Sequence, residues 1–230
     1  MHSYIKRKDI ILNFHCLKKQ LNIIVRLEMK IDIQDIKFWM DAIRNSEDKD
    51  RTLETFWGGQ IQSKLWLIET IAEKNKMIRN AEIVIHGGWN GLLASMLFNS
   101  EIGIKKVISV DVDPVCKEIA TTVNKRYEME GKFEAVTCDM VDYEYKAEPY
   151  IVINTSCEHI TQDKYKKWLA KVPDSAQVIV QSNDYYELEE HINCCKNLEQ
   201  FARRSLLDVD IKDEIELPKY KRFMVIGKKK

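Results

Sequence analysis

The sequence has no CxxC pair, no apolar run resembling a signal peptide or a membrane span, and no excess charge of either sign. Its 36 basic and 36 acidic residues cancel, so the chain has no general positive field to gather phosphate backbones or anionic membranes. The six cysteines are scattered along the chain, as is typical of reduced thiols in a cytosolic protein. These absences predict a cytoplasmic protein without a membrane partner.

The N-terminal part of the chain differs from the rest. Residues 1–28 carry six Lys or Arg against two acids and show no clear strand or helix period. A presequence and an extension before a start at Met29 both stay open for this segment. Residues 29–78 place apolar side chains at helical spacing and predict a helical cap, and residues 79–230 are predicted to form the main domain.

Beyond residue 80, strand-like and helix-like segments alternate with short turns. This alternation predicts βαβ units and a mostly parallel sheet. Two last strand candidates, 207–217 and 220–227, follow each other through a short turn at Pro218, which predicts an antiparallel hairpin. The other expected strands lie at 81–86, 105–111, 132–138, 149–154 and 176–182, and the helices between them at 91–98, 114–130, 163–172 and 197–205.

Three successive strand ends carry residues that suit a bound nucleoside. The first strand runs into the glycine turn 87–91, where bare backbone can approach a ligand closely. Asp111 ends the next strand, 20 residues after Gly91, where its carboxylate can accept hydrogen bonds from ribose hydroxyls. Asp139 ends the third strand. The alternative is that the glycines only allow a sharp turn and close helix-to-strand packing.

The order of these motifs resembles the class I S-adenosylmethionine-dependent methyltransferases. The segments IVIHGGWNG, VISVDVDP, AVTCDM and YIVINTS carry the resemblance, with RFMVIG resembling the last strand, over roughly residues 55–227. The resemblance implies a doubly wound α/β fold with a mostly parallel seven-stranded sheet, one strand antiparallel, and S-adenosyl-L-methionine as cofactor. It implies that the turn residues Gly87, Gly88, Trp89 and Gly91 lie at the methionine end, Asp111 at the ribose, and Asp139 with Met140 at the adenine.

The sequence departs from the family pattern at two positions. Ile85 stands where an acid is usual two positions before the first glycine, and Trp89 replaces the middle glycine of the turn. Either the loop is displaced or the indole covers part of the cofactor. Neither GxGxxG nor a GKS or GKT segment occurs, which disfavours a nicotinamide dinucleotide and a P-loop nucleotide.

The loop after the fourth strand, residues 154–159, holds six consecutive polar or reactive residues. By the resemblance this loop faces the transferred methyl group. His159 is therefore the first choice for a base that deprotonates an acceptor, with Glu158 as the other candidate and Asn154 orienting the acceptor. Loop capping and helix N-terminal charge are an equally weighted explanation of these residues.

Other polar residues are candidates for binding. Polar residues after the fifth strand, with one after the fourth, could form a substrate wall, and a plain turn with tyrosines outside the core is the alternative. Two residues of the helix before the first strand could hold a carboxylate, although a solvated helix face explains these two slightly better. The substrate candidates are Ser156, Asn183, Tyr185, Tyr186 and His191, and the carboxylate candidates are Gln60 and Lys64.

Cysteines and histidines of the types that bind zinc occur in the same two loops. Cys157 and His159 form a C-x-H pair, and His191 and Cys194 an H-x-x-C pair. Neither spacing is a familiar closed zinc motif. No metal is therefore part of the predicted site, although zinc binding by these four residues stays open.

The sequence thus predicts an enzyme that methylates an N or O nucleophile of a small molecule or a short polar acceptor. A tRNA or DNA base is the first competing acceptor, but zero net charge disfavours it, and NTSC stands where an NPPY-type sequence is usual. A non-catalytic S-adenosylmethionine-binding module is the competitor from another class. The acceptor's identity and the oligomeric state stay open.

Overall fold

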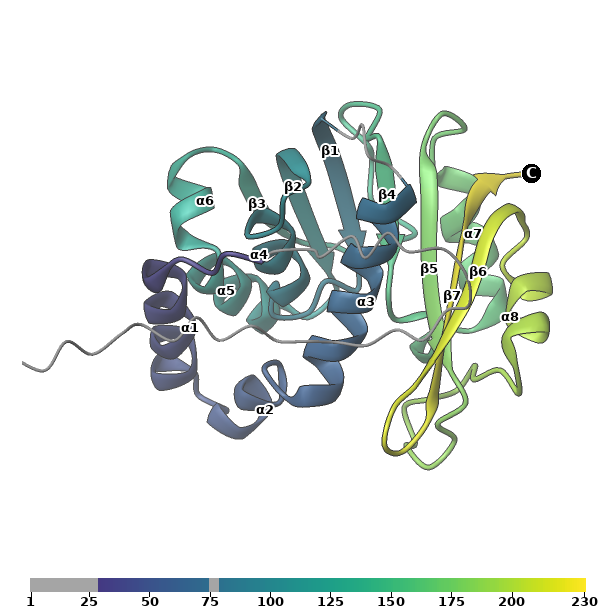
Figure 1. Cartoon of the computed structure of the whole chain (residues 1–230), viewed down its shortest axis with the longest axis horizontal. Helices are drawn as coiled ribbons and strands as arrows, with labels where there is room; N and C mark the ends of the chain where they lie inside the picture. Colours follow the sequence, from purple (N-terminus) through teal and green to yellow (C-terminus); the bar gives the residue numbers. More distant parts are fainter. Residues whose placement is uncertain (1–28, 75–78) are drawn as a thin grey trace, which may run out of the picture.

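The computed structural model describes residues 29–74 and 79–230, so the predicted extension at 1–28 lies outside the described residues. Seven strands form one sheet in the order β3-β2-β1-β4-β5-β7-β6 (Figure 1). The strands are Arg79–His86 (β1), Gly103–Asp111 (β2), Phe133–Thr137 (β3), Ile151–Asn154 (β4), Gln177–Asn183 (β5), Leu207–Glu216 (β6) and Lys221–Lys229 (β7).

The pairing of the strands confirms the expected sheet. The first five strands pair in parallel, and their apolar runs are the reason: every residue of β4 is buried, as suits a strand covered on both faces. The C-terminal hairpin pairs antiparallel from Leu207 with Lys229 to Glu216 with Lys221. Because β7 is also antiparallel to β5, it is the one reversed strand of the described sheet.

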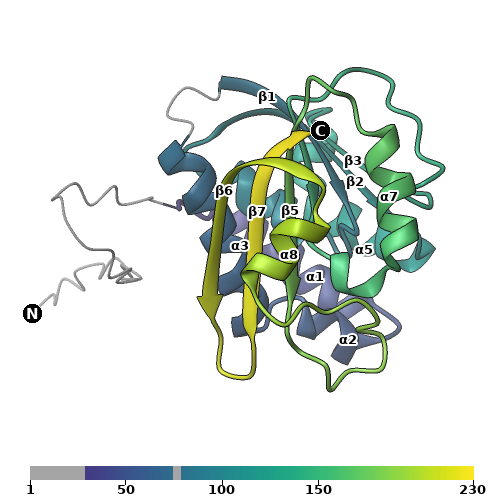
Figure 2. The same cartoon turned by 90° about the vertical axis from the view of Figure 1, so that its right-hand side faces the viewer.

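Helices cover both faces of the sheet, and Figure 2 places α3 and α7 on opposite sides of it. On one face α3, α4 and α5 contribute Ile68, Leu93 and Ala120 to the core, and on the other α7 and α8 contribute Trp168 and Phe201. No helix within 29–74 or 79–230 is both long and apolar enough to cross a bilayer. The α-helices are Ile33–Asn45 (α1), Lys49–Glu54 (α2), Gly58–Lys74 (α3), Leu92–Phe98 (α4), Pro114–Val123 (α5), Lys125–Met129 (α6), Gln162–Lys171 (α7) and Leu198–Arg204 (α8), and Cys157–His159 (η1) is a 3₁₀ turn.

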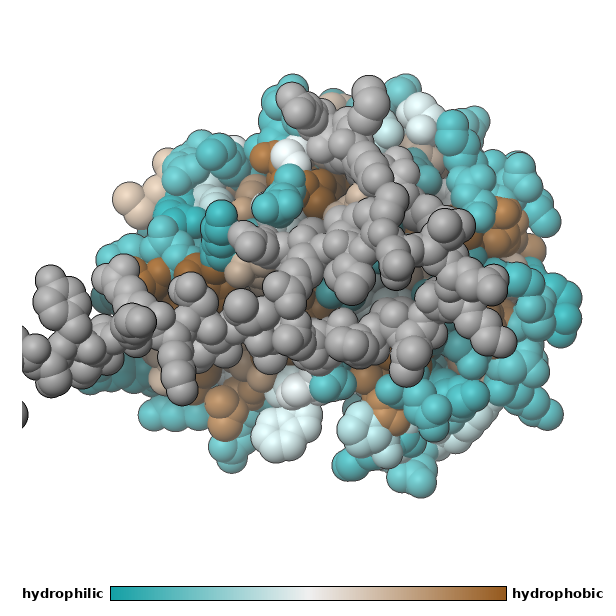
Figure 3. All heavy atoms as spheres, viewed as in Figure 1, coloured by the Kyte–Doolittle hydropathy of each residue, from teal (hydrophilic) through white to brown (hydrophobic). Residues whose placement is uncertain are grey.

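Helix α1 buries only part of its apolar side chains, with Trp39 packed against the core. Ile33, Ile36 and Met40 are exposed, whereas Asp35 is buried. The Asp35 carboxylate accepts a hydrogen bond of 2.8 Å from the Tyr127 hydroxyl. The polar contacts of Asp35 therefore dock this helix together with Trp39. Apolar side chains appear among hydrophilic ones on the same side of the molecule (Figure 3).

A bulge in β6 brings two backbones unusually close. Val209 pairs with Gly227 and Ile211 with Ile226, so one residue of β6 is left between them. A Cβ atom on Gly227 would lie 2.1 Å from the carbonyl oxygen of Asp208. Glycine is therefore required at this position of β7.

The substitution Gly227→Ala tests this contact. We expect it to lower the free energy of unfolding by about 1–3 kcal/mol through overpacking against backbone, measured by urea denaturation. Gly58→Ala is the matched control, because a Cβ there meets nothing within 4 Å, and it is expected to keep or slightly raise stability. Equal stabilities of Gly227→Ala and the unmodified chain would contradict the close approach.

Candidate active site

The loops that follow β1, β2 and β4 meet at the carboxyl edge of the sheet. The Trp89 backbone N–H donates to Asp111 Oδ2 at 2.8 Å, and the Ser156 hydroxyl donates to the Gly87 carbonyl at 3.4 Å. In Figure 1 the carboxyl end of β1 points toward the lower margin of the molecule. The outline in Figure 3, drawn in the same view, is notched at this lower margin between α2 and the β6–β7 turn. The structure thus brings together three loops that the sequence places in one site.

The glycine turn is shaped by its neighbours as well as by backbone freedom. Gly87 and Gly91 have φ of 61° and 75°, and Trp89 has φ of 47°, a conformation that a bulky residue rarely adopts. A Cβ on Gly88 would lie 2.0 Å from the Ser109 Oγ atom of β2, and one on Gly91 would lie 2.9 Å from a side chain of α5. Close packing therefore accounts for Gly88 and Gly91, whereas Trp89 holds a strained backbone at the tip of the loop.

The two predicted nucleoside acids are already engaged within the protein. Asp111 accepts the N–H groups of Trp89 and Asp113, one on each carboxylate oxygen, and each oxygen keeps a further lone pair. Asp139 forms an ion pair of 2.6 Å with Lys164. Burial raises the pKa of Asp139, but the bonds from Lys164 and Val141 outweigh it and hold this pKa below its usual value. Asp111 can still receive a hydroxyl, whereas Asp139 has a competing cation.

The side chain of Asn154 forms its hydrogen bond within its own loop. This residue is fully buried at the end of β4, and its Oδ1 atom accepts the Ser156 N–H at 3.0 Å. Its amide also lies 3.6 Å from the Met140 sulfur, which joins the loop to the predicted adenine side. Loop capping therefore accounts for the polar groups of Asn154.

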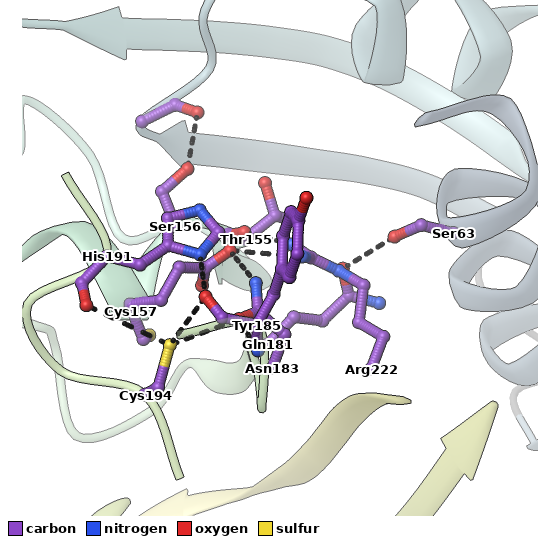
Figure 4. A network of polar contacts seen from close by, with 12 residues as sticks. Ser63, Thr155, Ser156, Cys157, Gln181, Asn183, Tyr185, His191, Cys194 and Arg222 are labelled. Atoms are coloured by element: carbon purple, nitrogen blue, oxygen red, sulfur yellow. Dashed lines mark hydrogen bonds and ion pairs between the residues drawn. The ribbon is translucent and has the colours of Figure 1, made fainter. Parts of the chain in front are cut away.

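Glu158 is held in a buried ion pair. Its side chain is nearly inaccessible, and Oε1 accepts from Arg222 Nη1 at 3.0 Å and from Asn183 Nδ2 at 2.8 Å. Arg222 also donates to the Thr155 carbonyl. The second oxygen, Oε2, has no hydrogen-bond partner among the described residues. Figure 4 shows the partners Arg222, Asn183 and Thr155 gathered around the end of β5.

The same network reaches the N-terminal helix α3. Gln181 of β5 accepts from Arg222 Nε at 3.2 Å and from the Ser63 hydroxyl at 3.3 Å, as Figure 4 shows. The next residue of this helix is Lys64, whose Nζ atom donates to the Gln60 Oε1 atom at 2.6 Å. Burial and the positive charge of Arg222 lower the pKa of Lys64 to about 7. Near neutral pH this amine is therefore neutral in part of the molecules.

Two histidines and a tyrosine line the outer part of the site. The rings of His159 and His191 meet edge to face with centroids 4.6 Å apart, and Tyr185 stacks on Tyr220 at 5.3 Å. Partial desolvation lowers the pKa of His159, outweighing the opposite effect of a nearby carboxylate. Tyr186, in contrast, is exposed at 57% and lies outside this network.

The possible four-residue zinc set is not gathered as one group. Glu158, His159 and His191 each offer a ligand atom, and these atoms lie within 4.8 Å of one another. Cys157 instead lies with its thiol near the Asn154 carbonyl, at 3.7 Å, and Cys194 donates to Asn183 Oδ1 at 3.3 Å. Glu158, rather than either cysteine, therefore joins the two histidines in one group.

Two buried residues of the region are not among the sequence candidates. Arg222 is the second residue of β7, and an arginine directly before the apolar run FMVIG is the signal that could have found it. His86 ends β1, is fully buried and lies 2.8 Å from the Tyr145 hydroxyl. Burial lowers the pKa of His86 to about 3, so the ring is neutral and packs among aromatic side chains such as Trp168.

No protein-family model matches the sequence, and no curated protein does. Solved structures match at low identity. The magnesium protoporphyrin IX methyltransferase ChlM of Synechocystis PCC 6803, with bound SAH, is 10% identical, with 86% of this chain and 95% of that chain aligned and a TM-score of 0.59. The N-methyltransferase NodS of Bradyrhizobium japonicum WM9 is 9% identical over 74% and 96%, with a TM-score of 0.57. An S-adenosylmethionine-dependent methyltransferase of Clostridium acetobutylicum ATCC 824 is 13% identical over 72% and 90%, with a TM-score of 0.54. The chain therefore has the class I methyltransferase fold.

A double-variant series tests the buried ion pair. Arg222→Met leaves Glu158 buried without a charged partner, so we expect the free energy of unfolding to fall by about 3–5 kcal/mol in urea denaturation. Adding Glu158→Gln should recover most of this loss, because the amide removes the buried charge and keeps an acceptor for Asn183.

An exposed ion pair supplies the control for this series. Lys212 and Glu199 lie 2.5 Å apart at the surface, and Lys212→Met should change stability by less than about 1 kcal/mol. A double variant no more stable than Arg222→Met alone would contradict the assignment of the loss to an unpaired charge.

Proposed function

We propose that the chain is an enzyme that transfers a methyl group from S-adenosyl-L-methionine to a nitrogen or oxygen nucleophile of a small molecule. The observation that carries the proposal is that hydrogen bonds connect the strand-end loops. The Trp89 N–H donates to Asp111, and the Ser156 hydroxyl donates to the Gly87 carbonyl. In a doubly wound sheet, this edge is where ligands bind. The class I methyltransferase fold supports the reaction type together with these contacts at its ligand-binding edge.

The residues of this edge fit the proposed cofactor. The turn at Gly87 offers backbone to the methionine end, Asp111 keeps lone pairs for ribose hydroxyls, and Met140 offers an apolar surface to the adenine. Lys64 with Gln60 is suited to a carboxylate, because a bound anion favours the protonated amine. When bound, the cofactor supplies an electrophilic methyl group, so the protein has only to align the acceptor and exclude water.

A protonated acceptor needs a group that takes its proton. His159 suits this role, because its lowered pKa leaves the imidazole neutral at pH 7. Glu158 is bound by Arg222 and Asn183, so we assign it to holding the loop rather than to proton transfer.

The outer residues suit the wall of an acceptor pocket. Tyr185, stacked on Tyr220, presents an aromatic surface beside His191, and Ser156 stands next to the glycine turn. The name of ChlM gives a small-molecule acceptor for that protein, magnesium protoporphyrin IX, and a net charge of zero fits such an acceptor better than nucleic acid. The five described cysteines are free, which supports a cytoplasmic location as part of the proposal.

Calorimetric titration with S-adenosylhomocysteine tests the cofactor site. The unmodified chain should bind it, and Asp111→Asn should bind it about 10- to 100-fold more weakly, because charge-assisted hydrogen bonds to the ribose are lost. Asp163→Asn is the matched control, since that carboxylate is 87% exposed on α7, and it should leave the affinity unchanged. Absence of binding to the unmodified chain, or equal affinity in Asp111→Asn, would overturn the assignment.

A further inference from the structure

The loops after β4 and β5 bring together three side chains of the types that bind metal ions. Glu158, His159 and His191 come from two loops far apart in the sequence and place one ligand atom each within 4.8 Å of the others. We infer that these three residues bind a single divalent transition metal ion, with zinc as the first choice. One carboxylate and two imidazoles are the donor set that three-ligand zinc sites and other first-row metal sites use.

Glu158 supplies the first independent observation. The residue is 2% exposed, yet its Oε2 atom has no hydrogen-bond partner among the residues that the structure describes. Oε1 is fixed by Arg222 at 3.0 Å and Asn183 at 2.8 Å, so the carboxylate cannot turn to satisfy the other oxygen without losing these bonds. An oriented, buried oxygen with a free lone pair is a preformed metal ligand, and its two partners are the kind of outer shell that orients such ligands.

His191 supplies the second observation. Its Nδ1 atom lies 2.7 Å from the Tyr185 carbonyl oxygen, a contact that Figure 4 shows. Because a carbonyl oxygen only accepts, Nδ1 carries the proton and Nε2 keeps its lone pair in the neutral ring. Metal-binding histidines are typically oriented by such a bond from the other ring nitrogen.

The arrangement leaves room for further ligands. Metal bonds of about 2.0–2.2 Å require the three ligand atoms to approach more closely than 4.8 Å, and rotation of the exposed His159 side chain can supply that movement. Because His159 lies at the surface, a bound ion keeps coordination positions open to solvent. Open positions are typical of catalytic rather than structural zinc.

A metal ion changes the assignment of the base, a consequence that rests on the proposed function. With its lone pair bound to the ion, His159 cannot accept a proton. The site then needs no neighbouring base, because the ion itself lowers the pKa of a bound acceptor and the proton passes to solvent. An acceptor oxygen can occupy an open position on the ion, where the positive charge favours its deprotonated form.

Cobalt titration of the full chain, first freed of metal by dialysis against a chelator, tests the site. We expect one Co²⁺ per chain with visible d–d absorption, displaced by Zn²⁺ and altered by acetohydroxamic acid, a small chelator that needs open positions. His159→Gln and His191→Gln should each weaken binding by more than the roughly 10- to 100-fold cost of losing an outer-shell partner. Both residues lie in loops at or near the surface, and urea denaturation checks that each variant folds.

Matched variants distinguish the ligand set from its alternatives. Cys194→Ser should keep the cobalt spectrum, because Cys194 bonds Asn183 rather than joining the cluster. Residues 1–28 contain two further histidines, so cobalt binding that survives both His159→Gln and His191→Gln would overturn the assignment. Absence of any cobalt spectrum, or its loss in Cys194→Ser, would overturn it as well.

Titration of the same metal-free sample with S-adenosylhomocysteine separates this inference from the proposed function. Binding of that compound without any cobalt spectrum leaves the proposed cofactor in place and removes the metal site. A cobalt spectrum that depends on His159 and His191, without binding of that compound, keeps the metal site and removes the proposed cofactor.

Discussion

The buried ion pair between Glu158 and Arg222 is the constraint on which the polar end of the molecule depends. It joins the loop after β4 to the reversed strand β7, and through Gln181 it reaches Ser63 of α3. A buried pair offsets its desolvation only when the remaining polar atoms are also satisfied. The guanidinium meets this condition with three acceptors, whereas the carboxylate leaves one oxygen free. The network therefore fixes the loop and leaves one defined atom for a ligand.

The strands could be predicted from the sequence because burial on both faces demands continuous apolar runs. The strands β4 and β5 carry such runs, and the hairpin of β6 and β7 follows from the short turn at Pro218. The burial of α1 could not be predicted in the same way, because helical spacing gives a periodicity without saying which face docks. Asp35 and Trp39 fix the face through partners distant in the chain. The predicted helix at 114–130 divides at Asn124, whose side chain donates to the Gly91 carbonyl.

The candidate site was predictable in position and only partly in its bonds. The carboxyl ends of neighbouring parallel strands meet at one edge, so the glycine turn, Asp111 and the loop after β4 could be placed together from order alone. Arg222 and Lys164 pair with residues 64 and 25 positions away. No local pattern encodes those distances, so the partners of Glu158 and Asp139 emerge only from the packed chain.

The central claim is methyl transfer at this edge of the sheet. Its most direct test is incubation of the full chain with S-adenosylmethionine labelled in the methyl group and a metabolite extract, beside separate reactions with tRNA and DNA. The account predicts label in the small-molecule fraction, lost when Asp111→Asn replaces the unmodified chain. Label on nucleic acid alone would contradict the acceptor class, and no transfer to any fraction by a chain that binds S-adenosylhomocysteine would contradict the claim of catalysis.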